Sequence, residues 1–179
     1  MFVITVGQLN CHGGLPCIQT ARLYRSVVDW LTMQTDGDSP DGVGLFVDGP
    51  NMLRDEFDVD LDDIRTAAAD TGRLAVIRLY VDEHATPGLI QAAEARGFEV
   101  IVTSGDVDVK LAVDAARFAI EQRGDTLAIA SRDTDFKPVL EVANNSGLRT
   151  LAIAPGVNGR SDALRNAATS SITLTEDDE

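Results

Sequence analysis

The chain has 179 residues, of which 44% are hydrophobic and 25% are charged, as in an ordinary single globular domain. These values exclude collagen-like and wholly disordered chains, and no apolar run approaches the roughly 18–20 residues that a membrane-spanning helix needs.

The charge is unusual, because 29 Asp and Glu outnumber 15 Lys and Arg and leave a net charge of −14. Asp and Arg predominate over Glu and Lys. This composition is typical of proteins from a high-salt cytoplasm, where screening cancels self-repulsion, and it favours a halophilic organism as the source. The alternative interpretation is a basic partner such as a histone or a cationic peptide.

Residues 1–42 differ in composition from the rest of the chain. They contain both cysteines and the single tryptophan but only 4 of the 29 acidic residues, and the run at 35–44 is rich in Asp, Gly and Pro, like a linker. Two interpretations stay open: a small N-terminal appendage, or upstream sequence translated from a misplaced start, with Met33 as the natural first residue. Cys11 and Cys17 are too few and too far apart for a structural zinc site. We interpret them as free thiols of a cytoplasmic protein without a signal peptide.

Short apolar runs alternate with amphipathic segments from residue 43 onward. Strands are expected at 44–48, 74–82, 98–104, 126–131, 148–154 and 171–174. Helices are expected at 59–72, 86–97, 108–124, 135–147 and 161–169. This alternation predicts an α/β domain over 43–175, a doubly wound and mostly parallel sheet of five to six strands in a three-layer, Rossmann-like sandwich. An acidic tail follows at 176–179, and the chain has neither a dinucleotide fingerprint nor a P-loop.

Acidic residues follow three of the expected strands. Asp48 follows the first strand, Asp106 and Asp108 follow the third, and Asp133 and Asp135 follow the fourth. In an open parallel sheet these positions meet at one edge, where ligands bind. Oxygen ligands without His or Cys suit Mg²⁺ or Mn²⁺. For any single Asp, a helix cap in an Asp-rich chain is the competing interpretation.

Two motifs occur in this order with an apolar helix between them: Asp-Gly-Pro-Asn at 48–51, and Ser-Arg-Asp-Thr-Asp-Phe at 131–136. With the intervening helix at 108–115, they resemble the NYN domain family, the LabA/DUF88-like proteins of the PIN-like nuclease superfamily. The likeness is to an archaeal branch of single-domain members and extends over about residues 43–175. It implies a PIN-like fold and a metal-dependent ribonuclease.

The resemblance also implies roles for individual residues. The expected metal ligands and catalytic residues are Asp48, Asp108, Asp133 and Asp135, with Asp106 and Asp114 as secondary metal candidates. The expected substrate-binding residues are Asn51, Lys110, Ser131, Arg132 and Lys137. The three cations are chosen because they lie near the motifs, and solvated charges that balance an acidic site are the alternative interpretation. Arg132 stands where a Gly is frequent in the family, and residues 1–42 have no counterpart there.

The expected function is an endoribonuclease that uses Mg²⁺ or Mn²⁺ to hydrolyse phosphodiester bonds of RNA, which an open cleft would admit as a single strand. The first alternative is a catalytically weak or inactive RNA-binding or regulatory NYN module. A phosphatase with a nucleophilic Asp is a third candidate, weakened because no Lys follows residue 137. No membrane partner is expected, and the oligomeric state stays open, a homodimer included.

Overall fold

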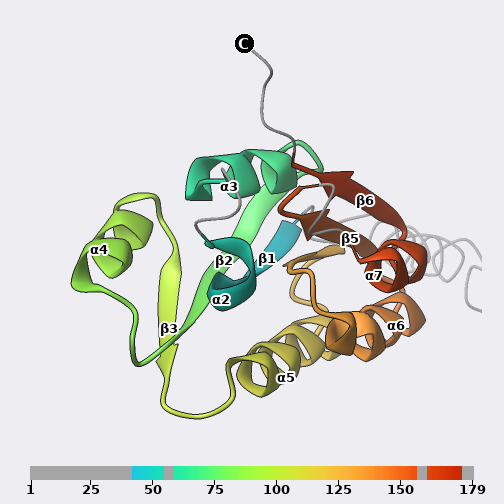
Figure 1. Cartoon of the computed structure of the whole chain (residues 1–179). Helices are drawn as coiled ribbons and strands as arrows, with labels where there is room; N and C mark the ends of the chain where they lie inside the picture. Colours follow the sequence, from blue (N-terminus) through green and yellow to red (C-terminus); the bar gives the residue numbers. More distant parts are fainter. Residues whose placement is uncertain (1–41, 55–58, 157–160, 175–179) are drawn as a thin grey trace, which may run out of the picture. The chain divides into compact units, whose positions relative to one another are not determined.

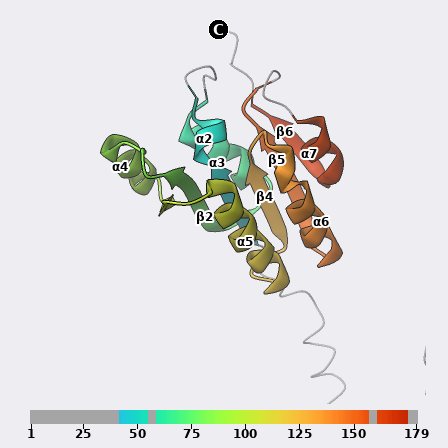
Figure 2. The same ribbon diagram turned by 60° about the horizontal axis from the view of Figure 1, so that its bottom comes forward.

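The computed structural model describes residues 42–54, 59–156 and 161–174, which form one six-stranded sheet between layers of helices (Figures 1 and 2). The features expected in 1–41, including the cysteines and the alternative start, lie outside the described residues, and so does the acidic tail. No helix in the described part of the chain is long and apolar enough to cross a membrane.

All six strands are parallel, in the order β3-β2-β1-β4-β5-β6. The strands are β1 (Gly42–Asp48), β2 (Arg73–Asp82), β3 (Glu99–Thr103), β4 (Thr126–Ala130), β5 (Arg149–Ala154) and β6 (Ser170–Thr173). The chain builds outward from β1 to β3, then returns to the other side of β1 for β4. The predicted doubly wound parallel sheet is therefore confirmed.

The helices are α2 (Gly49–Met52), α3 (Leu61–Ala69), α4 (Pro87–Ala95), α5 (Val107–Ile120), the 3-10 turn η1 (Thr134–Phe136), α6 (Lys137–Asn145) and α7 (Asp162–Ala167). Helices α3 and α4 bury their apolar residues on one face of the sheet. Helices α5, α6 and α7 bury theirs on the other face, and Figure 2 shows α5 and α6 side by side. These two separate cores, one on each face of the sheet, confirm the predicted three-layer sandwich.

The central strands are buried on both faces, which explains their unbroken apolar sequences. Every residue of β1 and β4 is buried, and the ring of Phe46 stacks against Tyr80 and meets Phe118 edge to face, with centroids 6.3 and 5.6 Å apart. Burial of this kind stabilises the fold by about 1.5–3 kcal/mol for each large side chain. The rigid centre fixes where β1 and β4 end.

The predicted elements are all present, with ends that differ by a few residues. Helix α3 begins after Asp60, because Asp60 and Asp63 form a capping box there. It ends at Ala69, inside the predicted 59–72. The predicted helix 135–147 is a 3-10 turn followed by α6. The short helix α2 is not among the expected helices, and it forms because the Asp48 side chain caps it.

Candidate functional site

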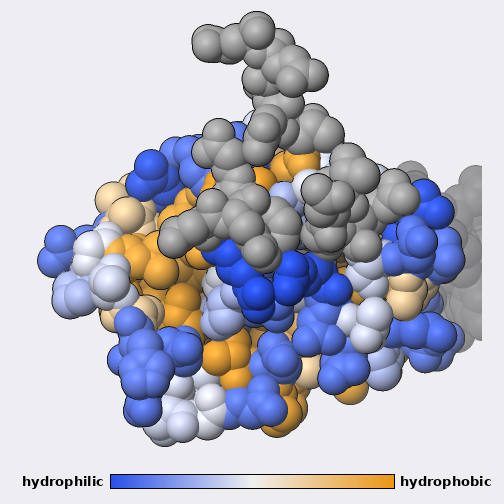
Figure 3. All heavy atoms as spheres, in the orientation of Figure 1, coloured by the Kyte–Doolittle hydropathy of each residue, from blue (hydrophilic) through white to orange (hydrophobic). Residues whose placement is uncertain are grey.

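The carboxyl ends of β1 and β4 lie side by side at the point where the strand order reverses. From that point the chain leaves β1 toward β2 and leaves β4 toward β5, so the two connections diverge and leave space between them. Hydrophilic residues gather on the viewed face between α2 and α5 (Figure 3). This edge of the sheet is where the sequence predicted the acidic residues to meet.

Asp48 is a fully buried carboxylate at the end of β1. Its Oδ2 accepts hydrogen bonds from Ser131 Oγ and Asn51 Nδ2, both at 2.7 Å, and its Oδ1 accepts from the Asn51 backbone N–H at 3.3 Å. Burial raises the pKa of Asp48 above its ordinary value, against the hydrogen bonds from Ser131 and Asn51, which lower it. No Lys or Arg among the described residues forms an ion pair with it. A buried carboxylate of this kind favours a cation beside it.

The turn that follows Asp48 depends on Gly49. A Cβ at this position would lie 2.7 Å from the backbone oxygen of Tyr80 and 2.8 Å from a methyl group of Val81. Only a residue without a side chain lets the chain pass so close to β2 and place Asn51 back over Asp48. Asn51 in turn accepts a hydrogen bond from Arg54 through its Oδ1 at 3.3 Å.

Ser131 links Asp48 to Asp133. Its side chain is buried, and its Oγ donates to Asp48 and accepts the Asp133 backbone N–H at 3.0 Å. Asp133 itself caps η1, since its Oδ1 accepts the Asp135 backbone N–H at 2.9 Å. This cap uses only one of the two carboxylate oxygens of Asp133. The substrate-binding role of Ser131 stays a prediction, although its hydroxyl is already hydrogen-bonded within the protein.

Asp108 comes to this edge on the first turn of α5. The preceding Asp106 caps that helix and accepts the Asp108 backbone N–H at 3.0 Å. Burial raises the pKa of Asp108 to about 6, and repulsion from neighbouring carboxylates adds to the rise. Those neighbours, in decreasing order of effect, are Asp48, Asp133, Asp106 and Asp135. The structure therefore brings acidic residues from three separate connections into one interacting group.

The acidic group, defined as Asp48, Asp106, Asp108, Asp133 and Asp135, is looser than a formed metal site. Within the ranges that the structure describes, no three His, Cys, Asp or Glu side chains are arranged to hold one ion. Like charges repel, and this repulsion adds to burial in raising the pKa of Asp108. The ligand assignments predicted from the sequence stay predictions.

The remaining predicted residues lie away from the group or in other contacts. Asp114 points to a different face of α5, where Lys110 Nζ lies 2.9 Å from its Oδ1. Lys137 pairs with Glu141 along α6 at 3.6 Å. Arg132 is half-buried between Ser131 and Asp133. The structure thus separates Asp114 from the other metal candidates.

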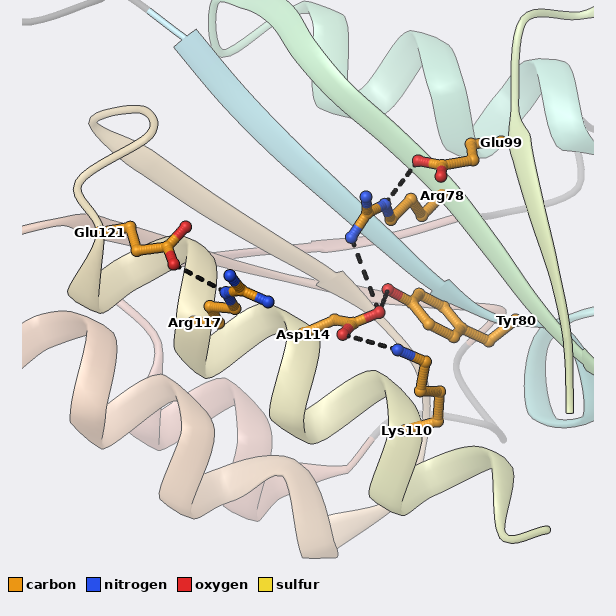
Figure 4. A network of polar contacts seen from close by, with 7 residues as sticks. All are labelled: Arg78, Tyr80, Glu99, Lys110, Asp114, Arg117 and Glu121. Carbon is orange, nitrogen blue, oxygen red and sulfur yellow. Dashed lines mark hydrogen bonds and ion pairs between the residues drawn. The ribbon is translucent and has the colours of Figure 1, made fainter.

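The network around Asp114 was not anticipated from the sequence (Figure 4). Tyr80 of β2 donates its hydroxyl to Asp114 Oδ2 at 2.9 Å, and Arg78 Nε lies 2.7 Å from Glu99 Oε2 on β3. Burial and the bond to Asp114 raise the pKa of Tyr80 well above its ordinary value, so its phenol stays protonated as a donor. A signal existed: Arg78 and Tyr80 are polar residues two apart in an otherwise apolar strand, so both point to one face.

Comparisons with known proteins agree with this geometry. An uncharacterized protein of Methanocaldococcus jannaschii is 39% identical over 135 residues, 75% of this chain; the chain spans 56% of that relative's length. A crystal structure of a protein of unknown function from Vibrio parahaemolyticus shares the fold, with a TM-score of 0.66, 19% identity and coverage of 79% of this chain and 98% of that chain. The model of the NYN domain matches residues 42–175. The chain therefore belongs to the NYN domain family, as its motifs and its strand-end carboxylates indicate.

Proposed function

We propose that this protein is a metal-dependent endoribonuclease whose acidic group binds Mg²⁺ or Mn²⁺ and hydrolyses single-stranded RNA. One observation supports this above all: Asp48 is a buried carboxylate without an ion-pair partner in the described residues, and other acids surround it. Placing several acids at one apolar strand edge costs free energy unless a cation neutralises them. NYN family membership supports the same reaction, because NYN domains are usually ribonucleases.

The chemistry of the donor set fits a hard divalent cation. The group offers carboxylate oxygens, which Mg²⁺ and Mn²⁺ prefer, and no His or Cys. Asp48, Asp108 and Asp133 would hold the ion, with Asp135 beside them. The ion would supply an activated water and would neutralise charge on the scissile phosphate.

The protein's own residues prepare that site. Ser131 and Asn51 hold the Asp48 carboxylate in one orientation, so its direction does not depend on the ion. Ser131 also fixes the backbone at Asp133. Because both aspartates are hydrogen-bonded to this serine, a displacement at the end of β4 would also move the Asp48 carboxylate at the end of β1.

The test is cleavage of labelled RNA by the parent and by Asp133→Asn, each with Mg²⁺, Mn²⁺ or EDTA. Asn caps a helix about as well as Asp, so the variant should fold as the parent does. It lacks one ligand charge, and we expect its cleavage rate to fall by at least about a hundredfold. Asp60→Asn is the matched control, because the Asp60 carboxylate also caps a helix, α3, by accepting backbone N–H groups, and it lies outside the acidic group.

Two outcomes would contradict the proposal. Cleavage by Asp133→Asn at the parent's rate would show that Asp133 is only a cap. RNA binding without metal-dependent cleavage by the parent would favour the alternative, a regulatory RNA-binding module. Circular dichroism of both variants checks that a lost rate does not reflect lost structure.

A further inference from the structure

An open groove of about 340 Å³ runs between α5 and the exposed side of β2 and β3. It exists because α5 crosses from β3 back over β1, while α4 lies on the opposite face, so no described helix covers β3 on this side. The groove is lined by Arg78, Glu99, Ile101, Lys110, Asp114, Arg117, Glu121 and Arg123. Figure 4 shows Arg78, Lys110 and Asp114 meeting in the space between helix and strands, with Arg117 and Glu121 paired along the helix.

The charge of this groove differs from that of the rest of the protein. Its lining holds four Lys and Arg against three Asp and Glu, whereas the remaining chain has 11 Lys and Arg against 26 Asp and Glu by subtraction from its totals of 15 and 29. A local excess of cations on a strongly acidic protein directs anions to that place. The groove is therefore a candidate binding site for an anion.

Some of these charges hold the fold together. Asp114 accepts hydrogen bonds from Tyr80 and Lys110 and lies 3.6 Å from Arg78 Nη1, which fastens α5 to β2. Burial alone would raise the pKa of Asp114, but the hydrogen bonds from Lys110 and Tyr80 lower it below its ordinary value. The Asp114 carboxylate is therefore ionised, and the cations beside it balance its charge. It can then hold α5 against β2.

Arg117 and Arg123 have no such structural task. The Arg117 side chain is 70% exposed, and its Nε forms an ion pair with Glu121 Oε1 at 2.7 Å. Arg123 makes no side-chain hydrogen bond or ion pair within the described part of the chain. A guanidinium has five N–H donors, so each arginine can still bind a phosphate.

Helix α5 connects the groove with the acidic group. Asp108 lies in the first turn of α5, and Lys110, two residues further on, lies on the side of the helix that lines the groove. At 1.5 Å per residue, Arg117 lies about 13 Å along the helix from Asp108. A chain of phosphates that starts at the acidic group could follow α5 and meet these cations in turn.

We propose that this groove binds the phosphate backbone of single-stranded RNA on its way from the acidic group, which rests on the proposed function. Lys110 and Arg117 of α5 and Arg123 just beyond its end follow one another along one side of the groove, which matches one backbone strand. The lining contains no aromatic side chain on which a base could stack, so the contacts are to phosphates and carry no sequence preference.

The experiment measures RNA affinity in EDTA, where cleavage cannot interfere. Fluorescence anisotropy over a KCl series compares the parent with the double variant Arg117→Ala/Arg123→Ala, using short labelled oligo-U and oligo-A. We expect the variant to bind about tenfold more weakly. The slope of log affinity against log salt should become shallower by about 1.4, the value for two lost phosphate contacts on a single strand.

Two further variants guard against a loss caused by misfolding. Arg149→Ala removes an exposed arginine of an ion pair with Asp125, outside the groove, and should bind RNA as the parent does. Glu121→Gln frees Arg117 from its carboxylate partner and should tighten binding several-fold, which damage to the fold cannot do.

The proposal is overturned if the parent binds no RNA in EDTA, or if the double variant keeps the parent's affinity and salt slope. Equal affinity for a duplex of the same length would overturn the single-strand assignment. These readouts do not depend on cleavage. A parent that binds RNA through the groove but never cleaves it would refute the proposed activity and leave the groove supported.

Discussion

Replacing Asp108 by Asn should stabilise the metal-free protein, and the gain should depend on pH. Burial and neighbouring carboxylates raise the pKa of Asp108 from an ordinary value of 3.8 to about 6. A carboxyl whose pKa is higher in the folded state favours folding while it is protonated, and that stability is lost as the pH rises through about 6. At about pH 8 the ionised Asp108 therefore destabilises the fold.

The size of the effect follows from the same shift. Full conversion at 1.36 kcal/mol for each pH unit gives an upper limit of about 3 kcal/mol. Asp108 is partly exposed, and solvent screening lowers the expected gain to about 1 kcal/mol. Urea unfolding in EDTA, followed by circular dichroism, should show this gain at about pH 8 and lose most of it at about pH 4.

Two controls make the result specific. Asp70→Asn removes an exposed carboxylate at the end of α3, outside the acidic group, and should change stability little. Mg²⁺ should stabilise the parent more than Asp108→Asn, since the variant has lost a ligand. A variant that is less stable than the parent at about pH 8, or equally changed at both pH values, would refute the repulsion argument.

Further predictions follow from the same edge of the sheet. Ser131→Ala removes a hydrogen bond from the buried Asp48 carboxylate and should lower the free energy of unfolding by about 1–3 kcal/mol at neutral pH, less in acid. Gly49→Ala places a Cβ 2.7 Å from the Tyr80 backbone oxygen and should cost about 1–3 kcal/mol, whereas Gly88→Ala, with open space around it, should cost nothing measurable. The melting temperature of the whole chain should rise from low salt to molar KCl, because its net charge is −14. A melting temperature that is independent of KCl would contradict the high-salt interpretation of the composition.

The fold could be predicted because each strand is a separate apolar run between turn residues. Burial of β1 and β4 on both faces leaves no polar residue in the strand interior to obscure the pattern. The short helix α2 was missed because its four residues include Gly and Pro, which are typical of loops. Its formation depends on the capping carboxylate of Asp48, which lies at the end of β1. The helix propensities of its own four residues do not predict it.

The acidic group was predictable for a different reason. In a parallel sheet, strand ends meet at one edge whatever the lengths of the connections, so Asp48 and Asp133 had to become neighbours once β1 and β4 were paired. The bridging role of Ser131 could not be read from sequence, because it depends on the register of those two strands. A slip of one residue would turn its hydroxyl to the other face.

Helical phase explains why Asp114 does not belong with Asp108. Six residues of α5 separate them, which is about 600° of rotation, so their side chains leave the helix about 120° apart. When Asp108 faces the strand ends, Asp114 faces β2. There its carboxylate is held by Tyr80 of β2 and Lys110 of α5. The same rotation places the cationic groove on the Asp114 side of the helix, whereas the acidic group meets another side at the helix start. Fastening α5 through Asp114 therefore also fixes where Asp108 stands, and the two charged regions are coupled through one rigid helix.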